Sequence, residues 1–328
     1  MVRHLNRLYC LGYLAVIYTI FAVLVSFFDV AWDNALIAGV GLVGFVLIGA
    51  HATFHIGAFS LAHSVRRLPQ VKDKALPFHT LEALEVEPLT LAEWVKAVAM
   101  ETFYTFKLNT FHQPWARNLE GIHLAEREWR THKPLPVLLV HGYLCNAGIW
   151  VSTREKLDHL HISNHAITLE PAIGSIKGYA IQIEQAIDEL LKATGAPQVN
   201  VICHSMGGVA IRYYAREKGH DKIAQVMTLG SPHYGTALSL LGIGKNVKQM
   251  MWGSFFLRQL QNDPTDLEFQ KKITSVWSPQ DTIVSPPQSS KLEFSKNLMV
   301  RGCGHVYRIH HPATETLMEE WLQANAEQ

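Results

Sequence analysis

A serine that follows a short apolar run is the first candidate for chemistry in this 328-residue chain. The run spans residues 199–203, and His204, Ser205, Met206 and two glycines follow it. This layout is typical of a nucleophile elbow, in which a strand turns sharply into a helix and raises the serine hydroxyl above the sheet edge. Small residues such as Gly207 accommodate the strained turn. We therefore expect nucleophilic chemistry at Ser205, with a serine in an ordinary strand-to-helix turn as the alternative.

An acid and a base follow this serine along the chain. Asp281 comes just after the strand-like run Ile273–Trp277, at the position expected for a carboxylate at a strand end. Asp263 and Asp266 are alternatives, but they fall in a polar turn that has the character of a helix cap and no preceding strand. We therefore favour Asp281 as the acid.

The favoured base is His305, which lies in a glycine-flexed loop close to the end of the sequence. His204 is adjacent to Ser205, so its side chain leaves the turn in a different direction from the hydroxyl. His141 is better placed to support the loop that follows an upstream strand. The resulting chain order is serine, aspartate, histidine.

Strand-like and helix-like segments alternate around these residues, which predicts an α/β fold with a mostly parallel sheet. Apolar, strand-like runs occupy residues 136–142, 165–169, 199–203, 226–235 and 273–277. Two helices are expected at residues 179–192, ending at Gly195, and at residues 207–218.

These segments together resemble the α/β-hydrolase superfamily, and within it the bacterial triacylglycerol lipases and related membrane-lipid deacylases. The resemblance rests on residues 140–143, 203–208, 230–236, 281–284 and 304–305, and on the order of the three catalytic candidates. It covers the chain from about residue 135 to the C-terminus. Cys203 stands where lipases carry glycine, and no acidic residue near His305 matches the structural calcium site of secreted members.

The resemblance implies acyl transfer through a covalent ester on Ser205. His305 would remove the hydroxyl proton and later protonate the leaving group, while Asp281 orients the imidazole. The backbone N–H groups of Tyr143 and Met206 would form the oxyanion hole. No metal or organic cofactor is expected.

Residues 237–260 form an insertion rich in methionine and aromatic side chains. In lipase-like proteins this position holds a mobile lid over the acyl-chain groove. An ordinary pair of buried helices is the alternative. The candidate lid or substrate-contacting residues are Met250, Met251, Trp252, Phe255 and Phe256.

The first part of the chain predicts a two-helix membrane anchor over residues 1–62. Apolar stretches at residues 8–28 and 35–59 are each long enough to cross a bilayer as a helix, for which about 20 residues are needed. A cleaved signal peptide and a buried core hairpin are the alternatives. Residues 63–134 are expected to form a membrane-proximal connector, and residues 135–328 the catalytic domain.

The connector contains one amphipathic helix. Thr90 and Glu93 have the spacing of a capping box, and apolar residues follow at helical spacing from Leu91. This helix can lie on the membrane or pack on the hydrolase domain, and we favour packing.

The basic residues near the two spans predict the orientation of the protein. They precede the first span and follow the second, and are Arg3, Arg7, Arg66, Arg67, Lys72 and Lys74. By the positive-inside rule both ends and the catalytic domain face the cytoplasm, which fits a bacterial inner-membrane protein. Reduced thiols are expected there, and a bond between Cys145 and Cys303 would indicate the opposite topology.

The sequence as a whole predicts a membrane-anchored serine hydrolase that cleaves carboxylic esters of lipids, of the lipase, phospholipase or lysophospholipase type. An acyltransferase, an acyl-thioesterase and a catalytically silent scaffold are the alternatives. The expected partners are the bilayer and a lipid acyl ester. A net charge of +1 with 17% charged residues argues against a nucleic-acid partner.

Overall fold

The computed structural model describes residues 1–28, 30–65, 87–125 and 134–324. Its centre is a seven-stranded sheet in the order β1-β3-β2-β4-β5-β6-β7. The strands are β1 (Gly121–His123), β2 (Val137–Val140), β3 (Asn164–Ile167), β4 (Val199–His204), β5 (Ile223–Leu229), β6 (Ile273–Trp277) and β7 (Lys296–Met299). Only β1 runs antiparallel to its neighbour β3, so the predicted mostly parallel α/β sheet is confirmed.

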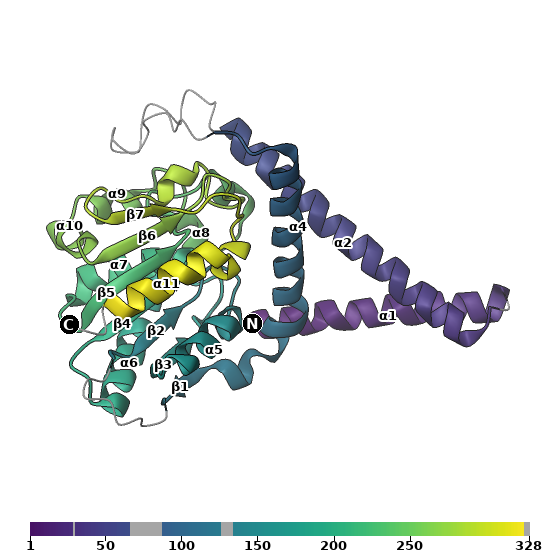
Figure 1. Cartoon of the computed structure of the whole chain (residues 1–328), viewed down its shortest axis with the longest axis horizontal. Coiled ribbons are helices and arrows are strands. Elements are labelled where there is room, and N and C mark those ends of the chain that lie inside the picture. The colour runs from purple at the N-terminus through teal and green to yellow at the C-terminus, as the bar shows by residue number, and fades with distance from the viewer. Residues whose placement is uncertain (29, 66–86, 126–133, 325–328) are drawn as a thin grey trace.

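Helices cover both faces of this sheet (Figure 1). Helices α6 (Ile176–Thr194) and α7 (Met206–Lys218) pack on one face, and α5 (Val151–His159) and α11 (Pro312–Ala324) pack on the other. Helix α6 ends at Gly195, whose φ of 69° is in the left-handed region that glycine adopts at little cost.

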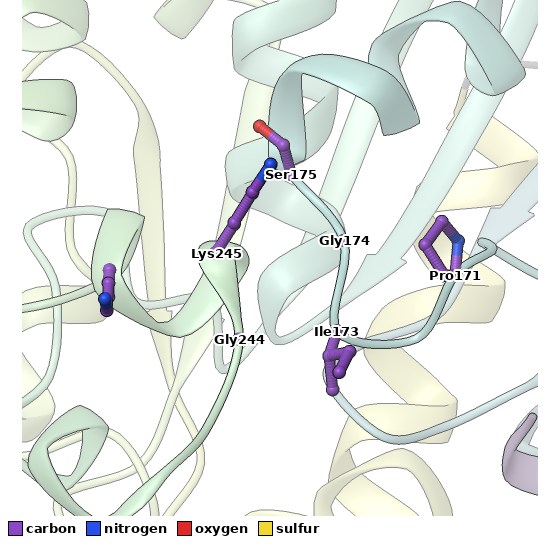
Figure 2. Close-up of a pocket in the computed structure, with 7 residues that line it drawn as sticks. Pro171, Ile173, Gly174, Ser175, Gly244 and Lys245 are labelled. Atoms are coloured by element: carbon purple, nitrogen blue, oxygen red, sulfur yellow. The ribbon is translucent and has the colours of Figure 1, made fainter.

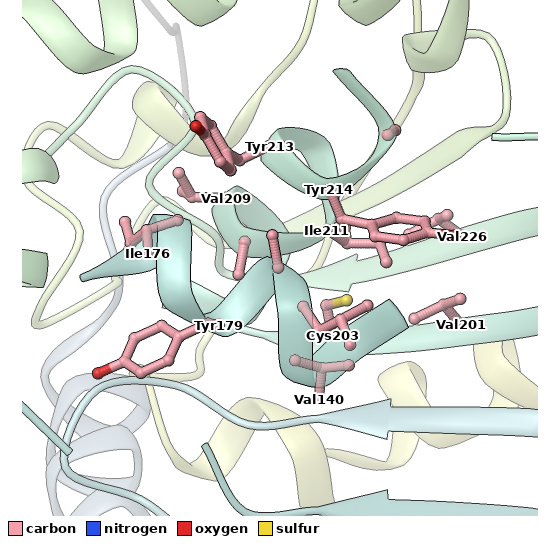
Figure 3. Packing of buried hydrophobic residues seen from close by; sticks show 14 of the residues in the cluster. Val140, Ile176, Tyr179, Val201, Cys203, Val209, Ile211, Tyr213, Tyr214 and Val226 are labelled. Atoms are coloured by element: carbon pink, nitrogen blue, oxygen red, sulfur yellow. The ribbon is translucent and has the colours of Figure 1, made fainter. Parts of the chain in front are cut away.

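Alternate residues of the strands supply the two hydrophobic cores. Val201 and Cys203 of β4 pack against α6 and α7, as Figure 3 shows, whereas Ile202 between them belongs to the core on the opposite face. Successive side chains of a strand point to opposite faces, so a run buried on both sides must be apolar throughout.

The segment between β5 and β6 contains short helices rather than a long helix pair. They are η5 (Ala237–Leu241), α8 (Lys245–Gln249), α9 (Phe255–Gln261) and α10 (Pro264–Gln270). Three other short helices connect the larger elements: η4 (Ala147–Trp150), η6 (Pro287–Ser290) and η7 (Tyr307–His310).

Helix α4 (Leu91–Lys107) begins with the predicted capping box, in which Thr90 and Glu93 satisfy each other's backbone N–H groups. It continues into η2 (Leu108–His112) and η3 (Gln113–Leu119). Met100 and Tyr104 of α4 pack against the core that contains α5 and α11. In Figure 1 this helix stands between the sheet and the two N-terminal helices.

The N-terminal helices are α1 (Val2–Phe28) and α2 (Trp32–Val65). Within the described residues, Val2–Ser26 is the one helical segment long and apolar enough to cross a membrane, and the apolar part of α2 that could be searched, Trp32–Val46, is shorter. Arg66, Arg67, Lys72 and Lys74 lie outside the described residues.

Candidate active site

Ser205 occupies the turn between β4 and α7 with φ of 53° and ψ of −124°. A positive φ is costly for any residue with a Cβ atom, so this turn is strained, as a nucleophile elbow is expected to be. The Ser205 N–H donates to the carbonyl of Leu229, with 3.0 Å between nitrogen and oxygen. This bond ties the elbow to the end of the neighbouring strand β5.

Two glycines allow the loop after β2 to lie directly against the elbow. A Cβ atom on Gly207 would stand 2.5 Å from the carbonyl oxygen of Val140, and one on Gly142 would stand 2.7 Å from the Cβ of Ser205. Real side chains do not approach so closely. Glycine at these positions therefore lets the loop predicted to supply an oxyanion donor reach the serine.

Asp281 and His305 lie in contact at the same edge of the sheet, after β6 and β7 respectively. The imidazole Nδ1 is 3.0 Å from Asp281 Oδ1 and 3.1 Å from Oδ2. An ionised carboxylate only accepts hydrogen bonds, so Nδ1 carries the proton and Nε2 is left to accept one. This is the tautomer that a general base requires.

His204 links the elbow to the His305 loop. Its Nε2 donates to the backbone carbonyl of His305 over 3.2 Å, and the two imidazole rings lie 4.7 Å apart. His204, the neighbour of Ser205 in the chain, is therefore in direct contact with His305. Within the part of the chain that the structure describes, the Ser205 hydroxyl itself makes no hydrogen bond. Catalytic hydrogen bonds in general are often long without substrate and tighten when it binds.

Asp281 is fully buried, and its surroundings stabilise its charge. Burial alone would raise its pKa, but the Arg308 guanidinium, the His305 ring when it is protonated, and the hydrogen bond from His305 hold the pKa of this carboxyl well below its usual range. Two backbone N–H groups, those of Ile283 and Val284, also donate to Oδ1 at 2.8 Å. Arg308 was not among the residues predicted from the sequence, because no motif marks it.

His141 supports the loop after β2, as predicted from its position. Its Nδ1 donates to the carbonyl of Gly142 over 2.7 Å, and its Nε2 accepts the N–H of Leu169 over 2.8 Å. Burial lowers the pKa of His141 to about 4, which keeps the ring neutral and able to accept.

The two predicted oxyanion donors flank the elbow. Met206 is the first residue of α7, where backbone N–H groups have no partner within the helix. Tyr143 follows Gly142, and its side-chain hydroxyl donates to the carbonyl of Ile243 over 2.8 Å. This bond connects the loop after β2 to the predicted lid insertion.

The alternative acids lie in other environments. Asp263 caps α10 and forms an ion pair with Arg216 at 2.9 Å. Asp266 is fully buried and accepts a hydrogen bond of 2.8 Å from Arg212 Nε. Both carboxyl groups have structural partners of their own, and neither contacts His305.

The five candidate lid residues differ in exposure. Met250 and Phe256 are buried in the core of α6 and α7, Met251 and Trp252 are partly buried, and Phe255 is 68% exposed. A hollow of about 550 Å³ lies beside this insertion, between residues 171–175 and the start of α8. In Figure 2 the side chain of Lys245 reaches across it toward Ser175.

All four cysteines, including Cys145 and Cys303, are free thiols. Among the described residues, no group of three or more histidine, cysteine or acidic side chains is arranged to hold a metal ion.

Solved structures with this arrangement of strands and helices include Bacillus licheniformis lipase BlEst2 in its mature form. The alignment has a TM-score of 0.54 at 18% identity and covers 60% of this chain and 95% of that one. The domain has a lipase-like α/β-hydrolase fold. Ser205 lies at the end of β4, the central strand of this sheet.

Sequence comparisons point to the same region. The sequence profile of the palmitoyl protein thioesterase family matches residues 136–265. A triacylglycerol lipase of Vibrio cholerae is 29% identical over 126 residues, which are 36% of this chain and 38% of that protein. A triacylglycerol lipase of Pseudarthrobacter phenanthrenivorans is 41% identical over 109 residues, or 31% of this chain and 34% of that one. This chain thus spans little more than a third of the length of these two lipases.

Proposed function

We propose that this protein is a membrane-anchored serine hydrolase that cleaves carboxylic esters of lipids. The observation that carries the proposal is the buried Asp281–His305 hydrogen bond at the sheet edge where the strained elbow holds Ser205. The similarity to triacylglycerol lipases supports an ester of a fatty acid as the substrate class.

In this proposal Ser205 Oγ attacks the ester carbonyl carbon while His305 Nε2 accepts the hydroxyl proton. The tetrahedral intermediate forms with its oxyanion at the N–H groups of Met206 and Tyr143. His305 then returns the proton to the leaving alcohol, and an acyl-enzyme remains. Water deprotonated by the same imidazole releases the fatty acid and restores the serine.

Contacts between α1 and the rest of the protein support a retained anchor. If α1 were a cleaved signal peptide, the groups that contact it would lose their partners. Arg7 Nε donates to the carbonyl of Pro114 over 2.8 Å, and its guanidinium lies 4.9 Å from the centre of the Trp115 ring. We infer a two-helix hairpin at residues 1–62 followed by a connector and the hydrolase domain. N-terminal sequencing of the membrane-extracted protein tests this, because cleavage after α1 would yield a chain that lacks the first helix of the hairpin.

The distribution of basic residues supports a cytoplasmic catalytic domain. A reporter enzyme that is active only outside the cytoplasm, fused after residue 328, should be inactive. Activity of that fusion would reverse the proposed orientation.

The central experiment is labelling of the full chain in detergent micelles with a fluorophosphonate probe, beside a panel of short- and long-chain acyl esters and glycerophospholipids. Wild type should be labelled and should hydrolyse ester. The matched Ser205→Ala variant should do neither while keeping the wild-type unfolding temperature. A wild-type chain that neither reacts nor hydrolyses would indicate a catalytically silent scaffold instead.

A thioester is the second candidate substrate, because the profile that matches residues 136–265 is that of a thioesterase family. The triad chemistry is the same for both, and only the leaving group differs. Turnover of a palmitoyl oxyester and the matching palmitoyl thioester distinguishes them after correction for their uncatalysed rates. Adding an alcohol or thiol acceptor and measuring the acyl product tests the acyltransferase alternative.

A further inference from the structure

Glu101 is a fully buried acid on α4, a helix that precedes the α/β-hydrolase sheet in the chain. Burying a charged group is costly unless hydrogen bonds replace the lost water. The partners of Glu101 therefore indicate what this residue does in the folded protein.

Three consecutive backbone N–H groups of the His305 loop donate to the Glu101 carboxyl group. Oε1 accepts from His305 at 2.9 Å and from Val306 at 2.8 Å, and Oε2 accepts from Tyr307 at 2.9 Å. These three N–H groups precede or begin η7 (Tyr307–His310), so they have no acceptor within that helix. One side chain thus holds the backbone of the proposed general base itself.

The same carboxyl group also reaches the loop of the proposed acid. Thr282, the residue after Asp281, donates its hydroxyl to Glu101 Oε1 over 3.4 Å. Both loops that must bring Asp281 and His305 together are therefore connected to one atom on α4.

The surrounding residues leave space for this carboxyl group and support it. A Cβ atom on Gly304 would stand 2.5 Å from Glu101 Cδ, so only glycine permits the approach. One turn further along α4, the ring of Tyr104 stacks on Tyr307 at 5.1 Å and on His310 at 4.4 Å. The segment from Gly304 to His310 is thus held against α4 by hydrogen bonds and by ring contacts.

We propose that Glu101 is a positioning residue for His305, so that α4, from outside the hydrolase sheet, completes the active site. The inference rests on the proposed serine hydrolase function. In this arrangement the helix that lies between the membrane segment and the sheet in the chain also sets the position of the catalytic base.

The test compares Glu101→Gln with Asp266→Asn in the full chain. Glutamine has the shape of glutamate but offers one oxygen and one NH2 group, so at least one loop N–H would face a donor instead of an acceptor. Asp266 is a matched control because it is equally buried and accepts hydrogen bonds from Arg212 and Gln270, away from the His305 loop. Both variants lose one buried negative charge.

For Glu101→Gln we expect kcat for a soluble acyl ester to fall about ten- to a hundredfold, since small misplacements of a catalytic group have effects of this size. KM should stay within about twofold of wild type, and the fluorophosphonate labelling rate should fall with kcat. Asp266→Asn should lower the unfolding temperature but keep kcat, measured well below that temperature and per folded molecule.

A second variant covers the case in which Glu101→Gln does not fold. Gly304→Ala leaves the carboxyl group in place but adds a methyl group where Glu101 Cδ lies, so it should separate α4 from the loop and lower kcat in the same way.

The inference is wrong if wild type is active and either folded variant, Glu101→Gln or Gly304→Ala, keeps kcat within twofold, or if Asp266→Asn loses as much kcat per folded molecule. A wild-type chain that neither hydrolyses ester nor reacts with the probe overturns the proposed function, and this inference with it.

Discussion

Asp281 and Arg308 form an ion pair that is closed to solvent, with 2.7 Å between Oδ2 and Nη2. Asp281 is therefore held between His305 on one side and a cation on the other. Gly230 makes room for the pair, because a Cβ atom there would overlap Arg308 Nη1 at 1.9 Å. The acid of the proposed triad is thus part of a buried network of three charged or ionisable side chains.

Replacing Arg308 by methionine should destabilise the protein strongly. It leaves a buried carboxylate with one less partner, and breaking a buried pair in this way typically costs about 3–5 kcal/mol of unfolding free energy. Chemical unfolding of the full chain measures the loss, with Arg308→Lys as the variant that retains the charge. A change below about 1 kcal/mol for the methionine variant would show that the pair contributes little.

Gly142→Ala should slow the reaction of Ser205 while the fold persists. The added methyl group would meet the Cβ of Ser205 at 2.7 Å, so the loop after β2 must move away from the elbow. We expect a loss of about a hundredfold in the rate of fluorophosphonate labelling.

Gly178→Ala is the control for that variant. Gly178 lies on α6 with nothing within 4 Å of an added Cβ atom, so alanine should leave labelling unchanged and stabilise the helix by about 0.5–1 kcal/mol. Equal labelling rates for the two variants would contradict the proposed role of the loop.

The stability of the protein should decrease as the pH falls from about 6.5 towards 4. Burial lowers the pKa of His141 to about 4 in the folded protein, whereas the unfolded chain takes up the proton near the ordinary value of 6.5. The unfolded state therefore binds more protons in this window, and the effect from His141 alone is of order 3 kcal/mol.

Unfolding free energies of wild type and His141→Gln, measured between pH 4 and pH 8, test this effect. The unfolding free energy of the variant should depend less steeply on pH than that of wild type. Some pH dependence should remain in both proteins, because burial also lowers the pKa values of His204 and His233. Parallel curves for the two proteins would argue against a neutral His141.

The cysteines should remain free thiols in protein purified without reductant. Cys203 and Cys303 are fully buried, and burial raises the pKa of both thiols, so they should react with alkylating reagents only after unfolding. Mass spectrometry after alkylation of native and denatured protein measures this. A Cys145–Cys303 bond in the native sample would contradict the structure and the proposed cytoplasmic orientation.

Local patterns were sufficient to predict much of the fold. The apolar runs before Ser205 and Asp281 became β4 and β6, and the capping box at Thr90 begins α4 as expected. These features depend on neighbours in the chain: side-chain periodicity, glycine at turns and reciprocal hydrogen bonds three residues apart. The segment of β1 lacked such a signal, because only three residues pair there and two of them are exposed.

The amino-acid sequence by itself determined the strand-to-helix turn at Ser205 and the order of the three candidate residues, since both follow from residue types at short spacing. Only the tertiary structure decided that Arg308 neutralises Asp281 and that Glu101 holds the loop of His305. Glu101 and His305 are separated by 204 residues, and such contacts depend on how the sheet and α4 pack. No local pattern records that packing, because many side chains distributed along the chain determine it together.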